Sequence, residues 1–109
     1  DIKNQQREHF LCLYFNARNQ VIYKEVVSIG SLSSSILHPR EVFQPAVSHV
    51  AASVVFAHNH PSGDVSPSQG DTDLTRRLVQ AGEIMGIDVL DHLIIGADDF
   101  LSLQDRRLL

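Results

Sequence analysis

The sequence has little cysteine, no long apolar run and no net positive charge, and each of these features excludes a class of protein. A single cysteine excludes an internal disulfide and a cysteine-rich zinc site, and it fits a reducing cytoplasm. No apolar stretch approaches the roughly 18 residues that a membrane span requires. The net charge is -4, so the chain lacks the basic field that drives non-specific binding of nucleic acid. We therefore expect a cytoplasmic domain that contacts neither membranes nor nucleic acid directly.

The length and composition predict one folded domain over residues 1–109. The chain is long enough for a single hydrophobic core, and its 43% hydrophobic and 20% charged content is typical of globular proteins. Residues 1–7 form a polar lead-in. No signal peptide is visible and the first residue is Asp1, so we interpret the chain as a fragment of a longer protein.

The pattern of apolar residues predicts an α/β fold, with a layered mixed β-sheet flanked by helices. Residues 9–15 are apolar at both alternating sets of positions, which predicts a central strand covered on both faces. A Gly/Ser-rich segment from Ser28 to Ser35 is interpreted as a connector or as a loop bordering a cleft. The remaining strands are expected at residues 21–27, 53–58, 87–95 and 100–103. A helix is expected from Pro39, with Val42, Ala46, Val47 and Val50 on its apolar side.

Two histidines and a carboxylate near the middle of the chain have the spacing of metal ligands. His58 and His60 are one residue apart at the end of an expected strand, so their side chains point the same way if the backbone is extended. Asp71 follows eleven residues after His60. Two imidazoles and one carboxylate are the ligand set of a catalytic zinc ion, with a fourth position left for water.

The second expected helix places Asp71 on its inward side. Ser66 is the predicted N-cap, Pro67 the first helical residue and Gly86 the left-handed stop. The apolar stripe of Leu74, Leu78, Ala81 and Met85, extended backwards by one turn, meets Asp71. A buried carboxylate needs a metal, another cation or hydrogen-bond donors. Taken alone, Asp71 is better explained by the helix dipole and the histidines by ordinary hydrogen bonds, but together they favour a metal site.

The amino-acid sequence around these residues resembles that of a known family. The pattern His58-x-His60, seven residues, Ser68, two residues, Asp71 resembles the motif of the JAMM (MPN-type) zinc metalloproteases. The segments HNHPSGD from His58, Pro39-Arg40-Glu41 and LDHLIIG from Leu90 are similar to the C-terminal domain of bacterial RadC proteins. The resemblance covers essentially residues 8–104, and it implies a JAMM/MPN fold with a cytidine-deaminase-like arrangement and a bound Zn²⁺.

The resemblance also implies two catalytic side chains. In JAMM enzymes a glutamate at the start of a strand beside the H-x-H strand takes the proton of the attacking water, and Glu8 has that position here. Glu41 is the alternative base, although a charge–dipole role at a helix N-terminus also explains it. Ser68 would donate a hydrogen bond to the oxyanion of a tetrahedral intermediate. Asp64 is a candidate hydrogen-bond partner for a histidine ligand.

Asp91 and His92 offer a rival acid–base pair or second metal site. As neighbours on a strand they face opposite ways, so we expect one of them on the core side with a hydrogen-bond partner, and not a catalytic pair.

Three functions fit these residues. The first is a zinc-dependent hydrolase of JAMM type acting on a peptide or isopeptide bond in a peptide or protein substrate. The second is a non-catalytic MPN-like binding or scaffold domain, and the third is a two-histidine, one-carboxylate iron(II) site. A zinc deaminase is excluded, because it needs H-x-E with C-x-x-C, whereas residue 60 is histidine and the chain has one cysteine.

Proteins of the RadC family have been described as DNA repair factors, and a helix-hairpin-helix type region usually precedes this domain in them. A DNA role would belong to that region. The residues of this chain predict neither an oligomeric state nor a particular substrate.

Overall fold

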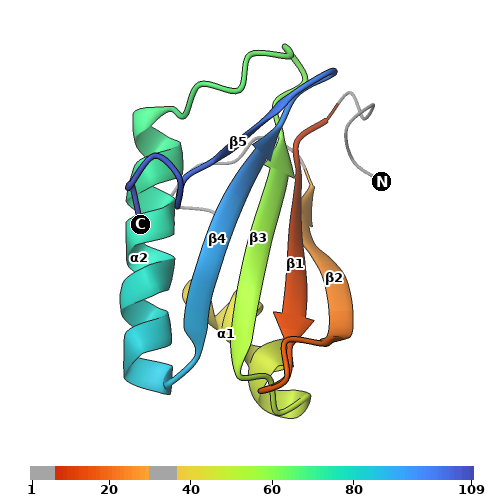
Figure 1. The fold of residues 1–109 in the computed structure, drawn as a ribbon, viewed down its shortest axis with the longest axis vertical. Coiled ribbons are helices and arrows are strands. Elements are labelled where there is room, and N and C mark those ends of the chain that lie inside the picture. The colour runs from red at the N-terminus through yellow and green to blue at the C-terminus, as the bar shows by residue number, and fades with distance from the viewer. Residues whose placement is uncertain (1–6, 30–36) are drawn as a thin grey trace.

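A five-stranded sheet with the strand order β2-β1-β3-β4-β5 forms the centre of the molecule (Figure 1). The computed structural model of the chain describes residues 7–29 and 37–109; most of the expected lead-in and of the Ser28–Ser35 loop lie outside these ranges. The strands are β1 (His9–Phe15), β2 (Val21–Ile29), β3 (Ser53–Asn59), β4 (Asp88–Ile95) and β5 (Phe100–Ser102). β3 and β4 are parallel and the other neighbouring pairs are antiparallel. The predicted α/β fold with a mixed sheet is confirmed.

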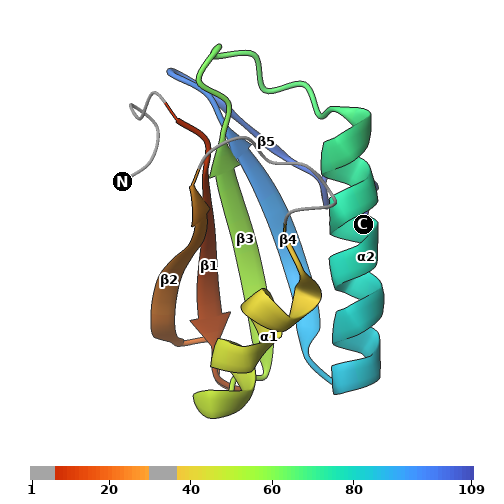
Figure 2. The ribbon, with the colours of Figure 1, turned by 180° about the vertical axis from the view of Figure 1, so that it is seen from behind.

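Helices α1 (Pro39–Ser48) and α2 (Gln69–Met85) share one face of this sheet. Figure 2 shows α1 lying across the face that is turned away from the viewer in Figure 1. Within residues 7–29 and 37–109, no helix is long and apolar enough to cross a membrane. Side chains from both helices and from alternate strand positions form one buried cluster, which includes Phe10, Cys12, Tyr14, Val42, Phe43, Ala46, Val54, Phe56, Leu74 and Leu78.

The inward side of α1 differs from the predicted one. Val42 and Ala46 are buried as expected, but Val47 is 55% and Val50 84% exposed. Phe43 takes part in the core instead, and Pro45 is buried within the helix without ending it. The helix stops at Ser48, and the chain then turns through a positive φ of 56° at Val50, which carries that side chain away from the core.

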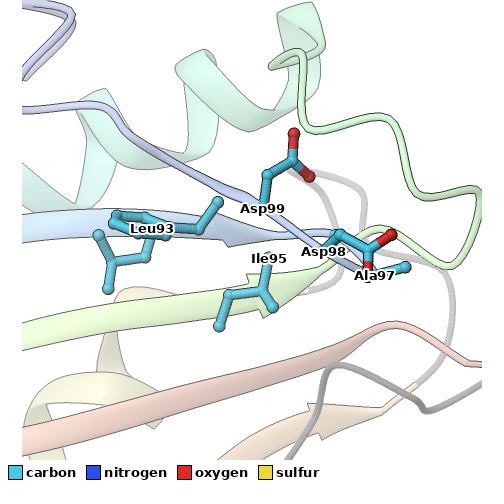
Figure 3. A pocket seen from close by; sticks show the side chains of 7 residues that line it. Leu93, Ile95, Ala97, Asp98 and Asp99 are labelled. Atoms are coloured by element: carbon cyan, nitrogen blue, oxygen red, sulfur yellow. The ribbon is translucent and has the colours of Figure 1, made fainter.

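The opposite face of the sheet is not covered by either described helix. β1 lies between β2 and β3, as predicted for a central strand, but its side chains alternate between buried and half-buried, so the prediction that both of its faces are covered was wrong. Figure 3 shows Leu93 and Ile95 projecting to the same side of β4, next to the β4–β5 turn that carries Asp98 and Asp99. The hollow that they line, of about 430 Å³, contains none of the predicted site residues.

Candidate metal centre

The C-terminal end of β3 holds the two histidines. His58 is the penultimate residue of the strand and is 1% exposed, on the same side of the sheet as Phe56. A tight turn follows, closed by a hydrogen bond from the Gly63 amide to the His60 carbonyl (2.9 Å), with Pro61 inside it. Gly63 has a φ of 88°, which favours glycine. The His60 amide donates to the Ile95 carbonyl (2.9 Å), so the second histidine remains attached to the end of β4.

The first turn of α2 holds the carboxylate, at the same end of the molecule as the end of β3 (Figure 1). The N-cap is Ser68 and not Ser66 as predicted. The Ser68 hydroxyl accepts from the Asp71 amide (3.0 Å), and the Asp71 carboxylate accepts from the Ser68 amide (2.8 Å). This reciprocal capping box fixes the Asp71 side chain, which is 10% exposed and lies on the inward side of the helix as predicted. Gly86, with a φ of 73°, is the predicted left-handed stop.

The three predicted ligand side chains meet. His58 Nε2 lies 3.0 Å from His60 Nε2 and 3.2 Å from Asp71 Oδ1, and His60 Nε2 lies 3.1 Å from Asp71 Oδ2. The same three residues form a group able to hold a metal ion. Ligand atoms placed tetrahedrally at about 2.0–2.1 Å from zinc are separated by about 3.3 Å. The observed separations are close to that value, so this donor set fits zinc.

The ring of His60 is oriented by the backbone. Its Nδ1 lies 2.7 Å from the carbonyl oxygen of Asp64, an atom that only accepts hydrogen bonds. Nδ1 therefore carries a hydrogen, and in the neutral imidazole Nε2 presents its lone pair to the other two side chains. The predicted contact between Asp64 and a histidine is made by the main chain and not by the carboxylate, which accepts from the Ser66 amide (2.9 Å).

The ring of His58 is held by a residue whose role the sequence did not reveal. His58 Nδ1 lies 2.7 Å from His92 Nε2, and His92 Nδ1 lies within hydrogen-bond distance of the Thr75 hydroxyl. His92 is fully buried, whereas Asp91 accepts from the Ser102 hydroxyl (2.7 Å). The prediction that one of this pair lies on the core side with a partner is confirmed. Thr75 was missed, although its place one helical turn after Asp71 was a usable signal.

Burial and hydrogen bonds set the protonation of two of these groups. Burial alone would raise the pKa of the Asp71 carboxyl, but the adjacent His58 ring and the hydrogen bond from the Ser68 amide outweigh it and hold that pKa below its ordinary value. Asp71 is therefore a carboxylate at neutral pH. Burial lowers the pKa of His92 to about 3, so its imidazole is neutral.

Glu8 precedes the strand that pairs with β3. Phe10 is paired with His58 in the antiparallel register, and Glu8 lies two residues before that pair, just outside β1. Asn59, which is fully buried, accepts from the His9 amide (2.6 Å) and donates to the Arg7 carbonyl (2.9 Å). The backbone on each side of Glu8 is therefore anchored to the residue between the two histidines.

The alternative base, Glu41, has a structural role in α1. Its carboxylate accepts from the His38 amide (2.9 Å) and so caps the N-terminus of that helix. This is the charge–dipole position that its sequence context also explained.

Comparison with known proteins gives the family. A family model, that of the RadC-like JAB domain, matches residues 1–108 of the chain. This chain belongs to the RadC-like JAB family. A relative of the RadC-like JAB domain, a UPF0758 protein from Desulforamulus reducens, is 54% identical over the whole of this chain and 48% of its own length. UPF0758 proteins from Bacillus cereus and Bacillus anthracis are 56% identical over 93% of the chain and 45% of their own length. The RadC-like JAB domain thus spans about half the length of these relatives, and the predicted resemblance is confirmed.

Proposed function

We propose that this RadC-like JAB domain is a zinc-dependent hydrolase that cleaves a peptide or isopeptide bond. One observation carries the proposal. The Nε2 atoms of His58 and His60 and the carboxylate of Asp71 face one another at 3.0–3.2 Å, while the Nδ1 atom of each ring is engaged elsewhere. Lone pairs and a negative charge at such distances repel unless a cation lies among them.

Each side chain has a defined task in this proposal. Zinc held by the three ligands would lower the pKa of a water molecule and polarise the substrate carbonyl. Glu8 takes the proton of the attacking water and delivers it to the leaving amine, which is general base and then general acid catalysis. Ser68 donates its hydroxyl hydrogen to the developing oxyanion. That hydrogen is available because the hydroxyl oxygen acts as an acceptor in the helix cap.

Metal binding by wild type and two helix variants tests the ligand set. Asp71→Asn removes the charge but keeps an oxygen able to cap α2, and Asp73→Asn is the matched control on an exposed carboxylate of the same helix. We expect one zinc per wild-type and Asp73→Asn chain. Asp71→Asn should lose more affinity than the roughly 10–100-fold typical of residues outside the ligand shell. Equal zinc affinity in all three proteins would remove Asp71 as a ligand. Tighter binding of iron(II) than of zinc to the wild type would favour the facial-triad site.

Hydrolysis by the zinc-loaded Glu8→Gln variant tests the chemistry. The substrate is a mixture of unmodified peptides and lysine-branched isopeptides, with products identified by mass spectrometry. We expect wild type to release products and Glu8→Gln to be about 10²–10⁴-fold slower with unchanged zinc affinity. Full activity of the variant would assign the base to another residue. A zinc-loaded wild type that cleaves neither class would favour the binding or scaffold role.

A further inference from the structure

The fully buried His92 has no part in the proposed reaction, although it is the nearest neighbour of a predicted ligand. It lies against the rings of Phe10 and Phe56, with centroid separations of 5.5 and 6.0 Å and edge-on geometry. Within this apolar surrounding its two nitrogens face His58 Nδ1 and the Thr75 hydroxyl. A polar ring in such a place is costly unless both nitrogens are hydrogen-bonded, and both are.

A β-bulge turns His92 toward the helices. Val54 is paired with Val89 and Val55 with Asp91, so Leu90 is an extra residue in β4. Without it, Val89 and His92 would face opposite sides of the sheet, because strand side chains alternate. With it, Val89 packs on the core below α2 and His92 also reaches that side. Bulges of this kind commonly redirect a side chain next to a functional site.

The hydrogen bonds that connect His58, His92 and Thr75 form a path in which every donor is fixed. The Thr75 hydroxyl has a single hydrogen, which it donates to the Asp71 carbonyl (2.7 Å). His92 Nδ1 must then donate to the Thr75 oxygen, which leaves His92 Nε2 as an acceptor. His58 Nδ1 donates to that acceptor, and the lone pair of His58 Nε2 is left facing His60 and Asp71.

We infer that His92 and Thr75 are positioning residues that hold His58 as the tautomer able to bind a metal, an inference that rests on the proposed zinc site. The path starts at the backbone of Asp71 and ends at the ring of His58, whose Nε2 lies 3.2 Å from the Asp71 carboxylate. A closed ring of contacts therefore joins two ligands through β4 and α2. Its role is to orient the ligand set before the ion arrives, which lowers the entropic cost of metal binding.

Nuclear magnetic resonance of the histidine side-chain nitrogens tests the direction of the path without metal. In the zinc-free wild type at mildly alkaline pH, where imidazoles are neutral, we expect the hydrogen of His58 on Nδ1. Thr75→Val should convert His58 to a mixture of tautomers. A wild-type His58 that carries its hydrogen on Nε2, or a Thr75→Val spectrum identical to that of wild type, would overturn the inference.

Zinc affinity, measured by competition with a chromophoric chelator, is the second readout. Thr75→Val removes the hydroxyl and nearly conserves the volume. Thr72→Val is the matched control, since the Thr72 hydroxyl bonds only locally, to the Gln69 carbonyl (3.0 Å), one turn earlier in α2. We expect Thr75→Val to bind zinc about 10–100-fold more weakly and Thr72→Val to differ from wild type by less than about twofold. Equal affinity of the two folded variants would overturn the inference.

Two substitutions of His92 separate positioning from packing. His92→Gln offers an oxygen that can accept from His58, whereas His92→Phe fills the apolar site without an acceptor. We expect His92→Gln to retain more zinc affinity than His92→Phe at similar thermal stability, and the opposite order would contradict the role. If wild type binds zinc but cleaves nothing, only the proposed hydrolysis fails. If wild type binds no metal, the spectrum of zinc-free His58 still decides whether the path holds that ring.

Discussion

The hydroxyl of Ser68 caps α2 and, in the proposed reaction, would also stabilise an oxyanion. Its oxygen caps α2 by accepting from the Asp71 amide, so its hydrogen is not used in that bond and would be the one donated to the oxyanion. The two functions are separable by substitution, because glycine at an N-cap costs only a few tenths of a kcal/mol, whereas alanine costs about 1 kcal/mol.

Ser68→Gly should therefore reduce catalysis more than stability. We expect hydrolysis to fall about 10²–10³-fold, as for removal of one oxyanion donor, with little change in the melting temperature or the zinc affinity. Steady-state rates and thermal unfolding on the same preparation provide the comparison. A Ser68→Gly protein that cleaves at the wild-type rate would leave Ser68 with the capping role alone.

The N-terminus of α2 shows what local sequence decides and what it does not. Two overlapping segments, Ser66 to Gln69 and Ser68 to Asp71, both match a capping box, and a proline lies between the two serines. The sequence predicted the helix, the inward positions of Asp71 and Leu74, and the Gly86 stop. It placed Met85 on the same inward stripe, but that side chain is 48% exposed. Tertiary contacts decide which serine is the N-cap. The carboxylate of Asp71 accepts from the Ser68 amide and also approaches His58 and His60.

Replacing Ser66 and Ser68 separately by alanine shows which of the two is the N-cap. Ser68→Ala should lower the free energy of unfolding by about 1 kcal/mol, because it removes the acceptor for the Asp71 amide. Ser66→Ala should change it by less than about 0.5 kcal/mol, the usual range for surface positions. Urea unfolding of both variants gives the comparison, and a larger loss for Ser66→Ala would move the cap to Ser66.

The contact between α2 and the start of β4 depends on a glycine. A Cβ on Gly82 would lie 2.4 Å from the Ile87 carbonyl oxygen, whereas one on Gly70 in the same helix would meet nothing closer than 3.7 Å. Alanine normally favours a helix over glycine by about 1 kcal/mol. The close approach of the backbone at Gly82 reverses that preference there.

Gly82→Ala should destabilise the protein by about 1–3 kcal/mol through overpacking, and Gly70→Ala should be neutral or slightly stabilising. Chemical denaturation of the two single variants measures the difference. If Gly82→Ala were as stable as Gly70→Ala, α2 and β4 would not lie as close as the structure has them.

At the scale of the whole molecule, the strands, the helices and the meeting of His58, His60 and Asp71 were predictable because each depends on short-range patterns. The side chains that hydrogen-bond to the predicted ligands were not predictable. The path from His58 through His92 to Thr75 depends on the extra residue Leu90 in β4, and no periodicity in the sequence marks that bulge. The sheet face that neither described helix covers was also not predictable, because Leu11 and Leu13 in β1 are apolar although only half-buried.

The single cysteine reports on the integrity of the core between the sheet and its two helices. Cys12 is fully buried in β1, and burial raises the pKa of its thiol to about 12. The thiolate that reacts with alkylating reagents is therefore both rare and inaccessible in the folded protein. We expect labelling to follow the global unfolding transition in urea. Labelling in native buffer at the rate of an unfolded chain would show that this core opens readily.

The most direct test of the proposed metal site of His58, His60 and Asp71 is a crystal structure of the zinc-loaded protein with anomalous scattering recorded at the zinc edge. We expect one strong anomalous peak, about 2.0–2.2 Å from His58 Nε2, His60 Nε2 and a carboxylate oxygen of Asp71. A map without a peak there, or a structure in which the Asp71 carboxylate points into solvent away from both rings, would contradict the metal site and the hydrolase proposed on it.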